Sequence, residues 1–405
     1  MYSAIILLLM ISNAIIPQTF FGPLPLWSIL SVCSLPFMLR KSLSGGNHVK
    51  AIYRNNFKLI IWLFLLPLVI LGIDAIHQVD EITRLDSRPL RDFGLGFSGV
   101  CLALSLATWI NLEKQNFERA ILWLGFAGVF VGCLSFAQYM EIPGAWELPD
   151  LLSLRSSEEY KFDHRIRGSF ATVHQFGPFA ATLALFLFLN ALNNKITRQR
   201  FLLFGAAVGC SFATLLTFSR AAIASLILCV MFSMAVYYRQ NKKLLVTILL
   251  GVSLLTVAGV LATNIDKSRH WQRLGDTQMR ADKDRWLTIK EGLMSGLSSP
   301  IIGVPPAEIE LPTHNIPANI FQRFGVVGLI FIGWLYYSVY RKTRRLVKND
   351  TSELKIMGLF GLSFLFIQVA NGMTHTSGFL FYDYWQWTFF GVLLSFFGKD
   401  RIKSE

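Results

Sequence analysis

Cysteine is sparse in this chain of 405 residues, and the few cysteines present are confined to apolar runs. They are Cys33, Cys101, Cys133, Cys210 and Cys229. Neither a disulfide framework nor a zinc site is therefore expected. The sequence also lacks internal repeats, low-complexity tracts and any cluster of residues spaced to bind another metal.

The sequence also lacks the pattern of a soluble protein. Soluble helices bury one stripe, so their apolar runs are short and alternate with polar residues. Here 53% of the residues are hydrophobic, and they form all-round apolar runs of about 17 to 25 residues, enough to cross a hydrocarbon core of about 30 Å. The expected fold is an all-α integral membrane protein with about twelve transmembrane helices, in one polytopic domain spanning residues 1–405.

The predicted spans are residues 3–16, 24–39, 57–76, 93–110, 119–140, 168–192, 201–218, 220–238, 244–263, 316–340, 356–372 and 377–397. Two segments outside them are long, residues 141–167 and residues 264–315. In the second segment, Trp286, Ile289, Leu293 and Leu297 recur at helical spacing. This spacing predicts an amphipathic helix near residues 281–297, lying on the outer membrane surface.

The net charge of +13 has a membrane explanation and does not indicate nucleic-acid binding. When the spans alternate sides, most lysines and arginines fall in short loops on one side, together with both termini. Basic loops remain in the cytoplasm. We therefore expect cytoplasmic N and C termini, membrane lipid as a partner, no nucleic acid, and residues 141–167 and 264–315 as external loops.

Arg220 lies where two predicted spans meet with almost no loop. Residues 201–238 form an apolar stretch of double length, broken only by Thr217-Phe218-Ser219-Arg220, so two helices must reverse there. An arginine near the bilayer centre costs about 2.5 to 3.5 kcal/mol on insertion scales, so it should face a cavity or a partner. Binding competes with two structural roles, in which Arg220 reaches lipid headgroups or pairs with a carboxylate such as Asp74.

A second polar cluster, residues 163–170, lies where the first long external loop enters a span. Arginines and free backbone N–H groups at a helix start suit a phosphate. Arg167 is the candidate ligand in this cluster. For His164 and Arg165, a solvated basic turn is the preferred interpretation.

His314 directly precedes the span at residues 316–340. Asn315 can cap this helix and Pro317 suits its first turn, which would place His314 beside the positive end of a helix dipole. That environment disfavours imidazolium and leaves a neutral ring able to accept a proton at about pH 7. A histidine that only forms a hydrogen bond at the membrane interface would fit equally well.

With Arg285 on the amphipathic helix, the external face offers several arginines and one candidate base. The middle of the spans contains no Asp or Glu pair. A diphosphate presented from the membrane would suit such a site, because arginines neutralise a leaving group as its charge develops.

These motifs resemble, in their order and spacing, the O-antigen ligase and polymerase superfamily of bacterial membrane glycosyltransferases. The resemblance covers about residues 165–335, and the preceding residues are similar only in hydropathy. Its pieces are Arg167-Gly168-Ser169-Phe170, Leu216-Thr217-Phe218-Ser219-Arg220-Ala221, the stretch from Arg285 through Pro300-Ile301-Ile302-Gly303-Val304, His314-Asn315, and residues 322–329. One departure is Ala221, where the family often has glycine; this small change should leave the arginine in place.

The resemblance implies a GT-C-like glycosyltransferase of the bacterial inner membrane with a periplasmic active site. It would transfer a glycan from undecaprenyl diphosphate to an acceptor hydroxyl, that of lipid A-core or of another glycan, with inversion and without metal or cofactor. By this analogy Arg220 and Arg285 bind the diphosphate, Arg167 is a further substrate-binding residue, and His314 is the catalytic residue that deprotonates or orients the acceptor.

Several alternatives stay open. The modest external loops favour a ligase, but a polymerase or a protein oligosaccharyltransferase of the same superfamily would have the same motifs. Twelve spans with both termini inside also fit a transporter, although ion-coupled carriers usually place carboxylates within their spans. A structural scaffold would leave Arg220 and His314 unexplained.

Overall fold

In the computed structural model, the regular secondary structure of the described residues is helical apart from one short pair of strands. The structure describes residues 2–14, 20–21, 24–44, 47–78, 88–148, 166–170, 172–217, 219–237, 286–305, 308–309, 313, 315–373, 385–397 and 399. Strands β1 (Phe20–Phe21) and β2 (Leu24–Pro25) are antiparallel. The helices are α1 (Tyr2–Ala14), α2 (Leu26–Ser44), α3 (Asn47–Gln78), α4 (Arg88–Leu112), α5 (Lys114–Tyr139), α8 (Val173–Asn193), α9 (Thr197–Leu216), α10 (Arg220–Tyr237), α13 (Ile316–Val347), α14 (Ser352–Gly372) and α15 (Gln386–Phe396). Residues 286–298 are also helical.

Eight of these helices are long and apolar enough to cross a membrane, so the chain is a multi-pass membrane protein. They are α3, α4, α5, α8, α9, α10, α13 and α14. The predicted spans 3–16, 24–39 and 377–397 correspond to α1, α2 and α15, whose apolar parts are shorter. The 11 residues of α15 cover only about 16 Å at 1.5 Å per residue. The predicted span 244–263 lies outside the described residues.

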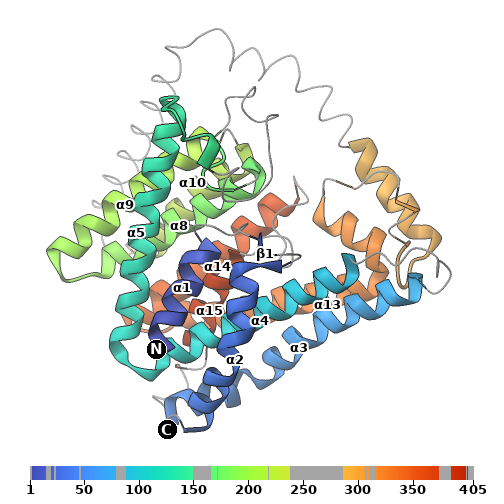
Figure 1. Cartoon of the computed structure of the whole chain (residues 1–405), viewed down its shortest axis with the longest axis horizontal. Coiled ribbons are helices and arrows are strands. Elements are labelled where there is room, and N and C mark those ends of the chain that lie inside the picture. The colour runs from blue at the N-terminus through green and yellow to red at the C-terminus, as the bar shows by residue number, and fades with distance from the viewer. Residues whose placement is uncertain are drawn as a thin grey trace.

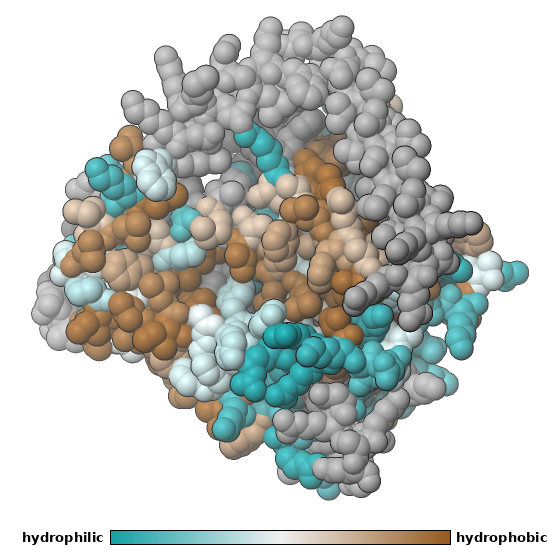
Figure 2. Space-filling model, turned by 180° about the vertical axis from the view of Figure 1, so that it is seen from behind, coloured by the Kyte–Doolittle hydropathy of each residue, from teal (hydrophilic) through white to brown (hydrophobic). Residues whose placement is uncertain are grey.

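The outer helices expose large apolar side chains, as a surface in contact with lipid requires. Leu68 on α3 is 51% exposed and Phe126 on α5 is 55% exposed. Figure 2 shows hydrophobic side chains over much of one face, with hydrophilic ones gathered in its lower part.

The core lies around α15, whose side chains are all buried. The ring of Phe389 lies 5.9 Å from that of Phe186 on α8 and 5.7 Å from that of Phe360 on α14. Gly391 approaches the backbone of Ala103 on α4. In Figure 1, α4, α14 and α15 lie between a group formed by α5, α8 and α9 and the pair α3 and α13.

The short basic connections gather at one end of the bundle. Lys342, near the end of α13, donates to Asn56 Oδ1 on α3 at 2.7 Å, and Asn56 donates to the carbonyl of Phe397. Ser352 at the start of α14 bonds Asn193 at the end of α8. We call the end of the bundle that holds these contacts of Lys342, Asn56, Ser352 and Asn193 the basic end.

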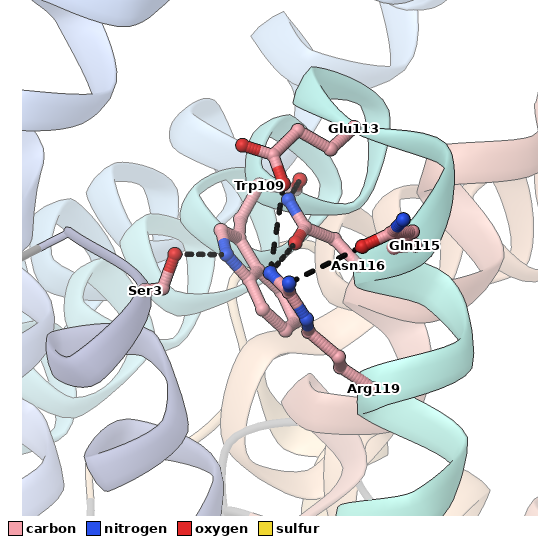
Figure 3. A network of polar contacts seen from close by, with 6 residues as sticks. All are labelled: Ser3, Trp109, Glu113, Gln115, Asn116 and Arg119. Carbon is pink, nitrogen blue, oxygen red and sulfur yellow. Dashed lines mark hydrogen bonds and ion pairs between the residues drawn. The ribbon is translucent and has the colours of Figure 1, made fainter.

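The α4–α5 connection also belongs to the basic end, since Asn111 donates to the carbonyl of Ser395, two residues before Phe397. Figure 3 shows its polar network. Arg119 donates to Asn116 at 3.1 Å and to Glu113 at 3.5 Å, and Asn116 donates to the carbonyl of Trp109 at 2.8 Å. The Asn116 bond satisfies one of the carbonyls that the end of α4 leaves without a partner in the helix.

Candidate functional site

Arg167 lies in a buried turn, residues 166–170, directly before α8. Its side chain is fully buried, and Nη2 donates to the carbonyl of Trp146 at 3.2 Å. The N–H of Ile166 donates to the carbonyl of Leu216 at the end of α9. The turn that carries Arg167 is therefore joined to the short link between α9 and α10.

Gln138 on α5 holds the same turn. Its amide donates to the carbonyls of Ala145 and Gly168 at 3.0 and 2.9 Å, and its Oε1 accepts from the N–H of Gly168 at 3.1 Å. Gly168 has a φ of 56°, and a Cβ there would lie 2.2 Å from the ring of Phe176. Only glycine fits this position without displacing the ring.

We expect Gln138→Leu to release the turn that carries Arg167. Three hydrogen bonds would be lost, and the buried backbone groups of Gly168 would lose their partners, at a cost of about 1 to 3 kcal/mol for each such group. The thermal midpoint of the detergent-purified protein should fall by several degrees. Gln115→Leu, at the exposed far end of α5, is the matched control, and an equal midpoint for the two variants would contradict this role of Gln138.

The predicted tight reversal near Arg220 is confirmed, since α9 ends at Leu216 and α10 begins at Arg220. The first turns of α8 lie against this link: a Cβ on Gly177 would lie 3.2 Å from the Cβ atoms of Ser219 and Ala222. Arg220 itself is exposed, whereas Ser219 is buried. The starts of α8 and α10 are therefore neighbours, with Arg167 and Arg220 in the segments that introduce them.

The predicted start of α13 is also confirmed. Asn315 is the N-cap, accepting from the N–H of Ala318 at 3.0 Å, and Pro317 lies in the first turn. The Asn315 amide donates to the carbonyl of Met373, just after α14. His314, the candidate base, lies outside the described residues.

The starts of α8, α10 and α13 lie at the same end of the bundle. Because the end of α8 meets the start of α14 through Asn193 and Ser352, and Phe186 meets Phe360, these two helices are antiparallel. The end of α14, where Asn315 binds, therefore lies level with the start of α8. The positive ends of these three helix dipoles thus lie at the end of the bundle opposite the basic end, and helix N-termini favour anions.

Residues 286–298 form a helix, and Arg285, which precedes it, lies outside the described residues. Its small residues face the protein: a Cβ on Gly292 would meet Thr313, and one on Gly296 would meet Phe321. Trp286 and Leu297 are 68% and 60% exposed. The apolar stripe therefore points away from the bundle.

Helix α13 is broken where the sequence predicted a continuous span. Gly325 has a φ of 59° and a ψ of −156°, and the segment 300–304 fills the break. The N–H groups of Val326 and Val327 donate to the carbonyls of Pro300 and Ile301 at 2.9 and 3.2 Å, and Val304 donates to the carbonyl of Gln322 at 2.7 Å. We call residues 300–304 together with residues 322–327 of α13, around the Gly325 break, the joint.

The residues of the joint, of helix 286–298 and of the α9–α10 link lie within one matched family region. Residues 205–333 match the family model described as O-antigen ligase. The chain contains an O-antigen ligase domain. This confirms the resemblance drawn from the sequence motifs. Arg220, Arg285 and His314 fall inside the domain and Arg167 falls outside it. No curated protein matches the chain.

Two side chains of α3, outside the O-antigen ligase domain, contact its joint. His77 Nε2 lies 3.1 Å from the carbonyl oxygen of Gly303, and Asp74 Oδ1 lies 4.0 Å from Arg323 Nη2. Both α3 residues are buried. Sequence reasoning did not single out His77 or Arg323. Asp74 and His77, three residues apart at the end of the apolar run of α3, were the signal that could have pointed to this contact.

Proposed function

We propose that this protein is an O-antigen ligase-type glycosyltransferase of the bacterial inner membrane. It would move a glycan from undecaprenyl diphosphate to a hydroxyl of lipid A-core on the periplasmic side. The observation that carries the proposal is that three helix N-termini, together with Arg167 and Arg220, lie at one end of the bundle, opposite the end that holds the short basic connections. By the positive-inside rule, that basic end faces the cytoplasm, so the end with the three helix starts faces the periplasm.

A diphosphate suits this end of the bundle electrostatically. Free N–H groups and the dipoles of α8, α10 and α13 stabilise negative charge, and arginines can bind phosphate oxygens in bidentate fashion. In the proposed reaction Arg220 and Arg285 hold the diphosphate, with Arg167 as a further ligand or support. Charge grows on the leaving phosphate as the bond to the sugar breaks, and these groups stabilise that charge.

His314 is the proposed base. The acceptor oxygen attacks the anomeric carbon from the face opposite the diphosphate, its proton passes to His314, and undecaprenyl diphosphate leaves. The configuration at that carbon inverts, and no step requires a metal. The cap formed by Asn315 would keep His314 next to the positive end of α13, where a neutral imidazole is favoured before the reaction.

A polymerase that joins two lipid-linked repeats is the second candidate, because the same anion site and base would serve it. Gene deletion separates the two. Loss of every ladder band from lipid A-core, with lipid-linked polymer still present, indicates a ligase. Core that carries a single repeat indicates a polymerase, and unchanged lipopolysaccharide contradicts both functions.

We expect His314→Ala and Arg285→Ala to abolish complementation of the deletion strain. Loss of a general base costs about 10²- to 10⁴-fold in rate, and loss of one charge-stabilising group costs a similar factor. Lipopolysaccharide gels and immunoblots of membrane levels are the measurements. A full ladder from His314→Ala at wild-type levels would remove the base from the mechanism.

A further inference from the structure

The joint in α13 brings two backbones into direct contact. A Cβ on Gly303 would lie 2.3 Å from the carbonyl carbon of Arg323, and one on Gly325 would lie 2.3 Å from the carbonyl oxygen of Ile301. Both glycines have positive φ angles, 78° and 59°. No side chain separates the backbone of residues 300–304 from that of α13 at the break. The direction of the first part of α13, residues 316–324, therefore depends on how the joint is held.

Helix α3 holds both parts of the joint from one face. Asp74 and His77 are three residues apart, so they lie on the same side of the helix. His77 contacts the 300–304 segment at Gly303, whereas Asp74 faces Arg323, two residues before the break. Arg323 is also over the ring of Phe324, with 5.0 Å between its guanidinium carbon and the ring centroid.

Burial makes these contacts informative. The Asp74 side chain is only 2% exposed, and an ionised carboxylate within a membrane span is costly unless it is paired, so such residues tend to be functional. Gly303 and Arg323, which these two α3 side chains contact, both belong to the O-antigen ligase domain. The part of α13 that contains Arg323 begins after its cap Asn315, the residue that follows His314 in the sequence. A small displacement of a catalytic group reduces rate strongly.

We propose that Asp74 and His77 are positioning residues that hold the joint, and thereby fix the start of α13 relative to α14 and α10. The role in catalysis rests on the proposed function, whereas the role in placing α13 does not. Both act through the joint, and the proposal gives neither of them a contact with substrate. His77→Ala and Asp74→Asn should displace residues 316–324 while leaving the rest of the bundle folded.

A disulfide between positions 316 and 372 reports the placement without any need for activity. A Cβ on Gly372 would lie 3.4 Å from the Cβ of Ile316, close to the separation of a disulfide. The experiment uses the full-length chain with its five native cysteines replaced and carrying Ile316→Cys and Gly372→Cys. We expect His77→Ala or Asp74→Asn to slow cross-linking in membranes about fivefold.

His77→Gln is the rescue variant, since its amide can donate to Gly303 as His77 Nε2 does. Asn56→Ala is the matched control, because Asn56 joins the same two helices at the basic end through Lys342. In transfer assays with purified protein and lipid-linked donor, His77→Ala should lower kcat about tenfold with an unchanged donor KM. His77→Gln should restore both readouts.

Equal cross-linking in His77→Ala, Asp74→Asn and the parent would overturn the proposal. So would equal effects of His77→Ala and Asn56→Ala, since that result would assign only general stability to the α3 contacts. Cross-linking that responds to the α3 variants as expected, together with wild-type protein that transfers no glycan, would contradict the proposed function alone.

Discussion

Arg220→Ala is expected to lower glycan transfer about 100-fold or more, the usual cost of removing one group that stabilises developing charge. Arg220 is exposed at the start of α10, beside the start of α8 and the turn that carries Arg167. Arg220→Lys keeps the charge but loses bidentate binding of phosphate, so an intermediate loss of about tenfold is expected. The measurement is the initial rate of transfer from a lipid-linked donor by purified protein.

The matched control for Arg220 is Arg198→Ala. Arg198 is also exposed in the first turn of a helix, α9, but α9 starts at the basic end. Its loss should leave the rate within about twofold, because charges at the far side of the membrane are too distant to act on the diphosphate. If Arg220→Ala keeps half of the wild-type rate, or if both variants lose equally, Arg220 does not bind the leaving group.

Gly325→Ala is expected to have the largest effect on stability. Its backbone angles suit glycine alone, and a Cβ would collide with the carbonyl of Ile301. Strain and collision together should cost about 3 kcal/mol of unfolding free energy. The thermal midpoint in detergent should fall, and transfer should fall with it because the joint directs residues 316–324.

Gly333→Ala is the control on the same helix. Nothing lies within 4 Å of a Cβ at Gly333, and alanine favours a helix by about 1 kcal/mol over glycine. This variant should be as stable as the wild type or more so. Equal midpoints for Gly325→Ala and Gly333→Ala would show that the break in α13 does not depend on glycine.

Much of the fold could be predicted from local patterns. An all-round apolar run of about 20 residues has one favourable environment, so α3, α4, α5, α8, α9, α10, α13 and α14 were expected near their observed positions. The start of α13 could be predicted from Asn315 and Pro317. The short link between Leu216 and Arg220 could be predicted in the same way, because each feature depends on only a few neighbouring residues. Helix 286–298 likewise follows from its own spacing.

Whether α15 is surrounded by lipid or by the other helices could not be predicted in this way. The run at 377–397 is as apolar as a span, yet in α15 every side chain is buried among α4, α8 and α14. An apolar sequence suits protein interior and lipid equally well. Only the packing of the other helices decides which of the two surrounds it.

The sequence by itself determined that this chain enters a membrane, where most of its helices begin and end, and which residues carry the family motifs. Only the tertiary structure decided that α8, α10 and α13 start at the same end, that Gln138 holds the Arg167 turn, and that α13 breaks at Gly325. It alone brought Asp74 and His77 to the joint, more than 200 positions away along the chain. The reason is that hydropathy and capping depend on neighbours in sequence, whereas these contacts depend on how helices pack across the bundle.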